Sequence, residues 1–558
     1  MKIREKLLEA KSYIKEKKET LLLSSAVMKY IFAVVLTALV ANTTNDGYYF
    51  IIGGIELLLI FFLTNVLHDK KKVSYLINSL LLLFYNIQMI VFVFGSSFVT
   101  VMMLSNMDSL KALSGEAVRY VSGALLVVLF SFLPVANCKK ELRMKITMAA
   151  AVMLLIEVSL ISSKSSMYSP YCGYANLFMQ YYHRKTAASQ VENLIKEDLE
   201  TAKLVESEMY QEEVKGYREK TDALAQQPNI IVIFTEGLSS VVVEDERNIT
   251  PNISKWKEKS IQFDYYFNHT FATYRALNGQ LYSGHQLSDI ENNPLISMQD
   301  ILHNQGYDSF FINTEPNNDD FTAYLKDLNF KELISDKTMN CCGLADSVCD
   351  KDAYELLYET ALERVHTGIP FFGAIYTFGT HTSFDSVHTK YGDGKDPVLN
   401  RFADMDAQFG AFMDKIEKNW MFNNTIIVFT TDHATYHDDP FHNSFPNHPC
   451  SFQSLDEIPL FIYHKGVEPE VIDVNGRNSL GLAPTLLDYM DVSAPNYSLG
   501  SSLFSGDEYG VQDIAYYDSV VLLGTDQGEV HEMDEADNSR MLELIHEYNV
   551  TKALVSKR

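Results

Sequence analysis

The sequence predicts a two-part protein, with helical membrane spans at its N-terminus and an α/β domain with a mostly parallel sheet after them. Three observations support this prediction. The long apolar runs fall almost entirely within the first 165 of the 558 residues. From residue 229 onward, short apolar runs alternate with segments of helical character. Those short runs are continuously apolar, which is typical of strands that are buried on both faces of a parallel sheet.

The composition agrees with this division and excludes one class of partner. Hydrophobic residues make up 47% of the chain, yet the mean hydropathy is only -0.06, so the apolar residues must be concentrated in one region. The net charge is -26 at pH 7. Nucleic-acid backbones attract basic surfaces, so we expect no nucleic-acid partner. An acidic protein can still hold a phosphate group where a metal ion supplies positive charge.

Five segments of the N-terminal region are long and apolar enough to cross a bilayer, which takes about 20 residues each. They are residues 22–41, 48–67, 74–97, 120–137 and 144–163. No signal-peptide cleavage pattern follows the first segment, so we expect it to remain as an anchor. Residues 1–165 are therefore predicted to form a membrane domain with five transmembrane helices.

The distribution of Lys and Arg predicts the orientation of these spans. The N-terminal segment and the loops after the second and fourth spans are rich in basic residues, whereas the first and third loops are poor in them. Basic segments stay on the cytoplasmic side of a membrane. We therefore expect a multi-pass protein of the cell membrane, with its N-terminus in the cytoplasm and its second half outside.

The second half is predicted to contain a helical linker at the outer membrane face, residues 166–228, and an extracytoplasmic domain, residues 229–558. Apolar residues recur at helical spacing within the charge-rich part of the linker. Strands of the domain are expected at residues 229–234, 309–312, 371–376, 425–429 and 460–463. Helices are expected at residues 297–304, 350–365, 400–418 and 482–490.

Side chains that bind metals follow two of the predicted strands. Glu236 comes just after the strand at 229–234, and Asp432 and His433 come just after the strand at 425–429. In open α/β sheets, binding sites gather at the carboxyl ends of the strands. Two carboxylates and an imidazole suit a divalent metal, with Mn²⁺ favoured and Mg²⁺ or Zn²⁺ as alternatives.

The order of these features resembles the alkaline phosphatase superfamily. A Glu after the first strand, a threonine-containing loop, a histidine after a middle strand and an Asp-His pair after a later strand follow one another as in that superfamily. Residues 483–487, Ala-Pro-Thr-Leu-Leu, are similar to its PTLL element. With five N-terminal spans, the chain looks like the sulfatase-like branch of lipoteichoic acid synthases and phosphoglycerol transferases. The resemblance covers the whole architecture, and residues 229–490 specifically.

The resemblance implies an alkaline-phosphatase-like (sulfatase-like) domain, in which helices cover a mostly parallel central sheet. Strand-like residues 514–517 and 520–523 would form the small C-terminal sheet that this superfamily often carries. It also implies a threonine nucleophile, which a bound metal activates by lowering the pKa of the hydroxyl. In Asn-His-Thr-Phe-Ala-Thr, residues 268–273, we assign this role to Thr270, which would share the metal with the three ligands above. Thr273 is the competing assignment.

Two further residues are assigned through the resemblance. His381 follows the strand at 371–376, where the family has a substrate-binding histidine, and it can donate to phosphate or protonate a leaving alkoxide. Arg275 can bind a phosphate oxygen with two parallel hydrogen bonds, with a surface ion pair as an equal alternative. Residues 441–452 are expected to form a lid or substrate loop. His448 in this loop is a candidate to reach the site, with a bystander role as the alternative.

The resemblance implies a metal-dependent transferase that moves a phosphoglycerol-type head group from a membrane phospholipid to an envelope glycan or polymer through a phospho-threonine intermediate. The alternatives are a phosphoethanolamine transferase, a sulfatase-like hydrolase of phosphate or sulfate esters, and a binding protein on a degenerate hydrolase fold. Position 270 is neither the Cys nor the Ser that sulfatases convert to formylglycine, which disfavours sulfate hydrolysis. Phosphoethanolamine transferases usually carry several disulfides, and the six cysteines of this chain are too few for that pattern, which disfavours this alternative. Two alternatives, a local disulfide and a zinc site, are kept for Cys341, Cys342 and Cys349.

Overall fold

In a computed structural model, the chain divides into two compact units, Met1–His183 and Arg184–Arg558. The structure describes residues 24–44, 46–67, 69–95, 98–99, 103–104, 117–135, 143–161, 168–178, 182, 209–218, 223–270, 272–286, 292–336, 338, 347–382, 384–448, 455–506, 514–517 and 521–556. The domain boundaries predicted at residues 165 and 228 stay predictions, since most of the predicted linker lies outside these ranges.

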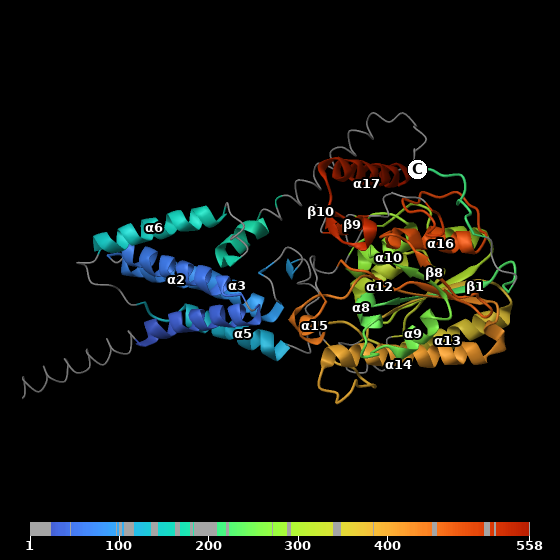
Figure 1. The fold of residues 1–558 in the computed structure, drawn as a ribbon, viewed down its shortest axis with the longest axis horizontal. Helices are drawn as coiled ribbons and strands as arrows, with labels where there is room; N and C mark the ends of the chain where they lie inside the picture. The colour runs from blue at the N-terminus through green and yellow to red at the C-terminus, as the bar shows by residue number, and fades with distance from the viewer. Residues whose placement is uncertain are drawn as a thin grey trace, which may run out of the picture. The chain divides into compact units, whose positions relative to one another are not determined.

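The first unit consists of apolar helices at all five of the predicted spans (Figure 1). The helix Ser24–Thr43, α2 (Tyr48–Val66) and α3 (Lys71–Gly95) are long and apolar enough to cross a membrane. The apolar stretches of α5 (Ala117–Ser131) and α6 (Arg143–Ile161) are shorter. Three helices therefore meet the length of a span, while five crossings and their orientation stay predictions.

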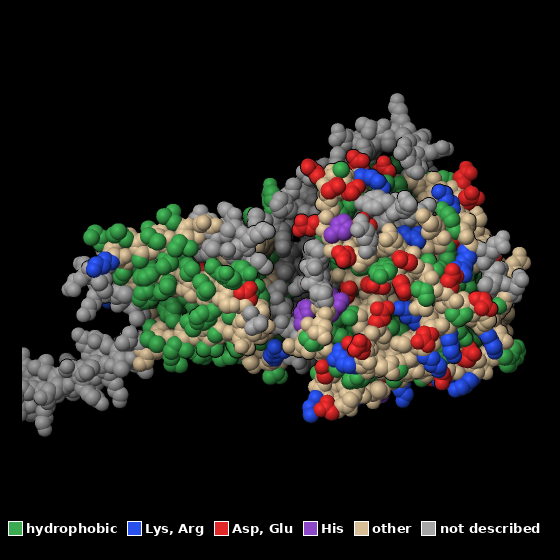
Figure 2. All heavy atoms as spheres, viewed as in Figure 1, with side chains coloured by type: hydrophobic (Ala, Val, Ile, Leu, Met, Phe, Trp, Pro, Cys, Tyr) green, Lys and Arg blue, Asp and Glu red, His purple; other side chains and the backbone are tan. Residues whose placement is uncertain are grey.

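Packing within this unit buries polar groups and leaves apolar ones outside. Helix α2 packs against α3 and α6, and α3 packs against α5. The buried Lys29 donates hydrogen bonds to Asn78 Oδ1 at 2.7 Å and to the Leu133 carbonyl at 2.9 Å. Figure 2 shows that hydrophobic side chains cover most of the visible surface of this unit. An apolar exterior around buried polar side chains is suited to a lipid environment.

The second unit is built on an eight-stranded sheet with the order β4-β3-β5-β1-β6-β7-β2-β8. All of its pairs are parallel except those of β7, which runs antiparallel to β6 and β2. This confirms the mostly parallel sheet. The strands are β1 Asn229–Thr235, β2 Ile261–Asp264, β3 Asp308–Ile312, β4 Glu332–Ile334, β5 Phe371–Thr377, β6 Thr425–Thr431, β7 Phe461–Tyr463 and β8 Glu470–Asp473.

Helices cover both faces of this sheet, as predicted (Figure 1). Along β1, Ile230, Val232 and Phe234 join a core that includes residues of α10, α11, α12 and α16, while Ile231 and Ile233 join a core with α9, α13 and α14. This alternation explains the continuously apolar strand, because both of its faces are buried. The helices are α8 Ser240–Val243, α9 Pro251–Lys257, α10 Thr273–Tyr282, α11 Met298–Asn304, α12 Asp319–Asp327, α13 Asp350–Thr367, α14 Pro397–Lys418, α15 Asp439–Ser444, α16 Leu482–Tyr489 and α17 Glu535–Val555.

A second, antiparallel sheet lies near the C-terminus, which confirms the small sheet predicted there. It consists of β9 (Ile514–Tyr517), β10 (Val521–Gly524) and β11 (His531–Glu532), with β10 in the middle.

Of the three neighbouring cysteines, the structure describes one. Cys349 is buried, and its Sγ lies 3.4 Å from His388 Nε2, while residues 341 and 342 lie outside the described ranges.

Asp406 of α14 anchors the first turn of α9, and we predict that this contact is important for stability. Its carboxylate is 2% exposed and accepts hydrogen bonds from the backbone N–H groups of Asn252 and Ile253 at 3.1 and 2.7 Å. Asp406→Ala leaves these buried donors without a partner, so we expect a loss of about 2–3 kcal/mol of stability in a denaturant titration. Asp414→Ala, on the same helix but exposed, is the control and is expected to change stability by less than about 0.5 kcal/mol.

Candidate active site

The three central strands of the sheet bring the predicted metal ligands to one edge. β1 lies between β5 and β6 and runs parallel to both, so the carboxyl ends of the three strands are adjacent. In the register, Thr235 is level with Thr377 of β5 and with Thr431 of β6. Glu236 and Asp432 are each the next residue after such a position. Strand pairing alone therefore places the two carboxylates side by side.

Glu236, Asp432 and His433 form a buried cluster whose ligand atoms all lie within 4.8 Å of one another. His433 Nε2 is 3.7 Å from Glu236 Oε1 and 3.4 Å from Asp432 Oδ2. The three residues are 6%, 0% and 3% exposed. The sequence prediction put these three side chains at one site, and the structure brings them together.

Hydrogen bonds orient the free atoms of this cluster toward one another. Asp432 Oδ1 accepts from the backbone N–H groups of Gly237 and His433 at 2.9 and 2.7 Å. Asp432 Oδ2 is buried and accepts no hydrogen bond from any described residue. His433 Nδ1 donates to the carbonyl of Ala434 at 2.7 Å, which leaves the Nε2 lone pair directed away from the backbone.

The electrostatics of the cluster fit a bound cation. Burial, together with the charge of Asp432, raises the pKa of Glu236 to about 7. Two buried carboxylates in contact repel each other unless positive charge or a proton lies between them. Asp432 Oδ2 points to the same conclusion, since it is buried, accepts no hydrogen bond from a described residue and faces His433 Nε2 at 3.4 Å, as a metal ligand would. Glu236, Asp432 and His433 are the residues that would hold a divalent metal.

The threonine loop meets this cluster through Thr273. Its Oγ1 lies 3.5 Å from Glu236 Oε2, which also accepts a hydrogen bond from the hydroxyl of Tyr376. Thr270, the predicted nucleophile and fourth ligand, is 2% exposed, and its carbonyl accepts a hydrogen bond from Asn268 Nδ2 at 2.8 Å. Thr273, the alternative in the sequence analysis, thus contacts the Glu236 carboxylate, while Thr270 as nucleophile and fourth ligand stays a prediction.

The backbone around Thr273 is arranged for this contact. Thr273 is the first residue of α10, where unpaired backbone N–H groups and the helix dipole favour a negative charge. Ala272 before it has a φ of 79°, a left-handed conformation that costs about 1 kcal/mol or more for a residue with a Cβ. Gln280, farther along α10, donates to the carbonyls of Thr431 and Asp432 at 3.0 and 3.2 Å. The helix is therefore fixed to the end of β6.

His381 lies in the loop after β5, as predicted. The Thr380 hydroxyl donates to the carbonyl of Glu236, which ties this loop to the end of β1. The His381 ring stacks on Phe378 with the ring centroids 4.9 Å apart. Burial, together with the positive charges of Arg401 and His433, lowers the pKa of His381 to about 4. At neutral pH this imidazole is therefore uncharged and donates one N–H.

Comparison with known families fits this geometry. Residues 228–492 match the sequence model of a family described as Sulfatase. This segment is a sulfatase-like domain, called the sulfatase domain below. It covers the strands that carry Glu236, His381 and the Asp432-His433 pair, and the sulfatase-like family predicted from the sequence is confirmed. None of the curated proteins matches the chain.

Solved structures similar to the chain include three with related names. A protein in the alkaline phosphatase superfamily from Vibrio parahaemolyticus is 18% identical, with 61% of this chain and 89% of that chain covered and a TM-score of 0.50. The lipoteichoic acid synthase LtaP from Listeria monocytogenes is 13% identical over 62% and 94%, with a TM-score of 0.45. The integral membrane protein lipooligosaccharide phosphoethanolamine transferase A from Neisseria meningitidis is 14% identical over 85% and 96%, with a TM-score of 0.47. The sulfatase domain thus has the fold of the phosphoryl and sulfuryl transferases and hydrolases of that superfamily.

Arg401 is a residue of the sulfatase domain that the sequence prediction missed. It is 2% exposed, and its Nη1 donates to the Thr382 carbonyl at 2.9 Å. Its Nε and Nη2 are buried and have no hydrogen-bond partner among the described residues. Its charge contributes to lowering the pKa of His381, and the charges of Asp438, Asp396 and Glu236 act on Arg401 in turn. A signal was present, because Arg401 lies three residues after Val398 and four before Met405, on the apolar stripe of α14.

Arg275, by contrast, lies within the predicted loop but inside α10. It is 5% exposed, and its charge contributes to lowering the pKa of His269, which burial lowers most. A surface ion pair, the alternative weighed from the sequence, does not fit this burial. Its role in binding phosphate stays a prediction.

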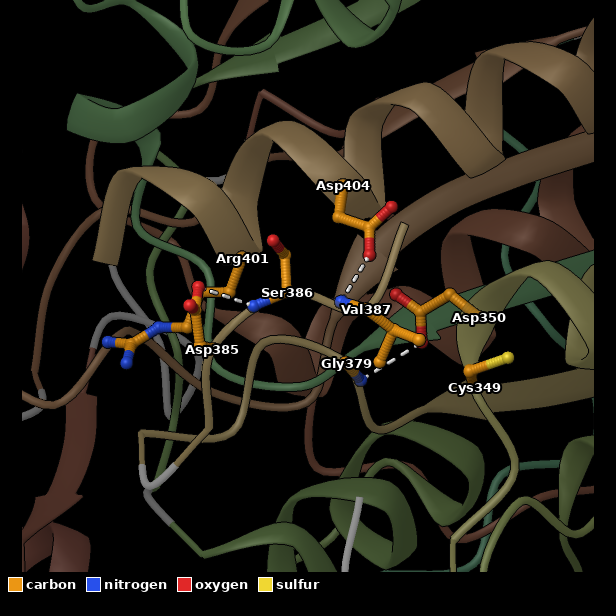
Figure 3. Close-up of a pocket in the computed structure, with 8 residues that line it drawn as sticks. All are labelled: Cys349, Asp350, Gly379, Asp385, Ser386, Val387, Arg401 and Asp404. Carbon is orange, nitrogen blue, oxygen red and sulfur yellow. Dashed lines mark hydrogen bonds between the residues drawn. The ribbon is translucent and has the colours of Figure 1, made fainter. Parts of the chain in front are cut away.

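A small pocket beside the His381 loop shows how that loop is held (Figure 3). Gly379 N–H donates to Asp350 Oδ1 at 2.9 Å, and burial raises the pKa of Asp350 to about 7. In the figure, the Arg401 guanidinium extends away from Asp350. Asp350 is thus a positioning residue for the turn that leads to His381.

Gly379→Ala is expected to disturb this turn. A Cβ at residue 379 would lie 2.4 Å from Asp350 Oδ2 and 2.7 Å from Oδ1, closer than atoms in contact allow. We expect a loss of about 1–3 kcal/mol of stability, measured by denaturant titration. Activity should fall as well, because His381 lies two residues away. Gly506→Ala, where a Cβ meets nothing within 4 Å, is the control and is expected to match the unsubstituted protein. Equal losses in the two variants would contradict the role of Asp350.

Proposed function

We propose that this protein is a membrane-anchored, divalent-metal-dependent phosphotransferase with a threonine nucleophile. The observation that carries the proposal is the contact between Thr273 and Glu236 at a buried cluster of two carboxylates and an imidazole. Such a cluster is costly without a cation, and a hydroxyl beside it is placed for attack on phosphorus. We take Mn²⁺ as the favoured metal, with Mg²⁺ or Zn²⁺ as alternatives, because two of the three ligands are carboxylates.

When bound, the metal would supply Lewis-acid chemistry, since it lowers the pKa of a neighbouring hydroxyl and offsets negative charge on phosphoryl oxygens. Thr273 Oγ1 loses its proton and attacks phosphorus as the bond between phosphorus and the leaving alkoxide breaks. The released alkoxide takes up one proton, so the proton count is unchanged. The product is a phospho-threonine. A hydroxyl of the acceptor then attacks the same phosphorus, and Thr273 is regenerated.

Three features of the chain act on the group being transferred. The first N–H groups of α10 face the negative charge that develops near Thr273. Arg401 holds two buried N–H donors without partners among the described residues, which fit phosphoryl oxygens. His381 has a pKa of about 4, so at neutral pH it is a neutral imidazole that donates one N–H hydrogen bond. We therefore assign His381 to substrate binding.

For the donor we propose a membrane phospholipid with a phosphoglycerol head group, and for the acceptor an envelope glycan or polymer. Apolar helices keep the sulfatase domain at a membrane, where a lipid donor is concentrated. This proposal includes the predicted outward orientation of the domain, because envelope polymers lie on that side.

The experiment is an assay of the full chain reconstituted into vesicles with Mn²⁺. Vesicles of phosphatidylglycerol should give diacylglycerol at a rate well above vesicles of phosphatidylethanolamine. Faster release from phosphatidylethanolamine would favour a phosphoethanolamine transferase instead. Release of sulfate from p-nitrophenyl sulfate, with no diacylglycerol from either lipid, would favour a hydrolase. A protein that turns over none of these and binds no metal would contradict the proposal.

A further inference from the structure

A second group of metal-binding side chains lies outside the Glu236 cluster. His437, His448 and Asp456 offer ligand atoms that all lie within 4.8 Å of one another. His448 Nε2 is 2.9 Å from Asp456 Oδ2, and His437 Nε2 is 3.4 Å from the same oxygen. Nothing in the proposed reaction uses these residues.

His437 is buried in a way that calls for a partner. Its side chain is 1% exposed, Nδ1 has no hydrogen-bond partner among the described residues, and Nε2 lies 3.4 Å from Asp456 Oδ2. Its ring stacks on Phe441, with centroids 4.9 Å apart and planes 12° apart, so Nε2 is held toward Asp456. A cation placed between Nε2 and Asp456 Oδ2 would bind both atoms, because imidazole nitrogen and carboxylate oxygen are common metal ligands.

Asp456 is oriented for the same purpose. Its Oδ1 accepts the N–H of Glu457 at 2.9 Å, which leaves Oδ2 facing the two imidazoles. The N–H of Asp456 donates to Asn268 Oδ1 at 3.1 Å, and Asn268 Nδ2 donates to the Thr270 carbonyl. The carboxylate is therefore fixed from both sides.

The separations and the chemistry of these atoms suit Zn²⁺. Zinc binds imidazole nitrogen and carboxylate oxygen at about 2.0–2.2 Å, so neighbouring ligand atoms of a tetrahedral site lie about 3.4 Å apart. The distances of 2.9 and 3.4 Å are close to that value. Two imidazoles and one carboxylate are softer than the Glu236 cluster, which has one imidazole and two carboxylates.

We propose that His437, His448 and Asp456 bind a Zn²⁺-type cation that is separate from the catalytic metal and leaves a fourth position open for water. The ion joins residues 437 and 448, around α15, to residue 456 ahead of β7. It thereby fixes both ends of the segment that follows the Asp432-His433 pair. It also links that segment, through Asn268, to the loop that leads to Thr273.

In the test, the full chain in detergent is stripped of metal by a chelator and then dialysed against Zn²⁺. The bound ions are counted by inductively coupled plasma mass spectrometry. We expect two ions per chain in the unsubstituted protein and one in Asp456→Asn or His448→Gln. His531→Gln is the matched control, because His531 also pairs with an aspartate, Asp526, outside both clusters, and it should keep two ions. Circular dichroism checks that each variant is folded, and two separate variants guard against the loss of one.

The outcomes separate this site from the proposed function. Glu236→Gln should also leave one ion, and the double variant Glu236→Gln, His448→Gln should leave none. If the unsubstituted protein binds one ion and Asp456→Asn keeps it, Asp456 merely pairs with two histidines and the inference is overturned. If it binds one ion that His448→Gln removes and Glu236→Gln does not, the second site stands and the catalytic metal site fails.

Discussion

Thr273→Val is expected to lower the transfer activity by at least about 1000-fold, because it removes the hydroxyl that would attack phosphorus while keeping the shape of the side chain. The hydroxyl lies 3.5 Å from Glu236 Oε2, within the reach of a metal held by that carboxylate. The measurement is the initial rate of diacylglycerol release from phosphatidylglycerol vesicles with Mn²⁺. A phosphate-bearing peptide containing residue 273, trapped by acid quench and identified by mass spectrometry, would show the covalent intermediate directly.

The matched control is Thr270→Val, which removes the other hydroxyl of the same loop. We expect it to keep activity within about 10-fold, with a loss of stability of about 1 kcal/mol from one hydrogen-bonding group. The reverse result, with Thr270→Val inactive and Thr273→Val active, would restore the nucleophile that the sequence favoured. Loss of activity in both variants, with both still folded and metal-loaded, would leave the choice to the position of the trapped phosphate.

The ambiguity between these threonines shows what the sequence lacked. The strands β1, β5 and β6 were predicted because each is a continuous apolar run, and their ends placed Glu236 and the Asp432-His433 pair correctly. Helix α10 was not predicted, because its buried side chains include Arg275, Asn278 and Gln280, whose burial follows from tertiary contacts rather than an apolar stripe. Without the start of that helix, two threonines three residues apart could not be told apart.

Short strands, and polar side chains inside correctly predicted elements, were missed for a related reason. β2, β4 and β8 have three or four residues each. Two residues of β2 are buried and none of β4 or β8 is, so these strands carry little apolar signal. Tyr376 and Arg401 were missed because each lies in an element that the apolar pattern already explained. Their polar ends reach the site only through the pairing of β5 with β1 and the packing of α14, which the local sequence does not encode.

Asp432→Asn is expected to have opposite effects on the metal-free and the metal-loaded protein. Asparagine keeps Oδ1 for the N–H groups of Gly237 and His433, but it removes the charge that Oδ2 places beside Glu236. Without metal, this relieves the repulsion between two buried carboxylates, so the melting temperature in chelator should rise by a few degrees, about 1 kcal/mol. With metal, affinity should fall by at least about 100-fold and activity with it, because a charged ligand is lost.

The measurement is a pair of thermal melts, one in chelator and one in excess Mn²⁺, for Asp432→Asn and for the exposed control Asp414→Asn. The unsubstituted protein and the control should both be stabilised by Mn²⁺, by an amount that grows with the metal concentration over the dissociation constant. Asp432→Asn should start higher and gain little. A variant that is destabilised in chelator, yet gains as much from Mn²⁺ as the control, would mean that Asp432 supports the fold and does not hold the ion. Asp432 Oδ2 is buried and accepts no hydrogen bond from a described residue, whereas a purely structural carboxylate would be hydrogen-bonded at both oxygens. We therefore expect Asp432→Asn to start higher and to gain little from Mn²⁺.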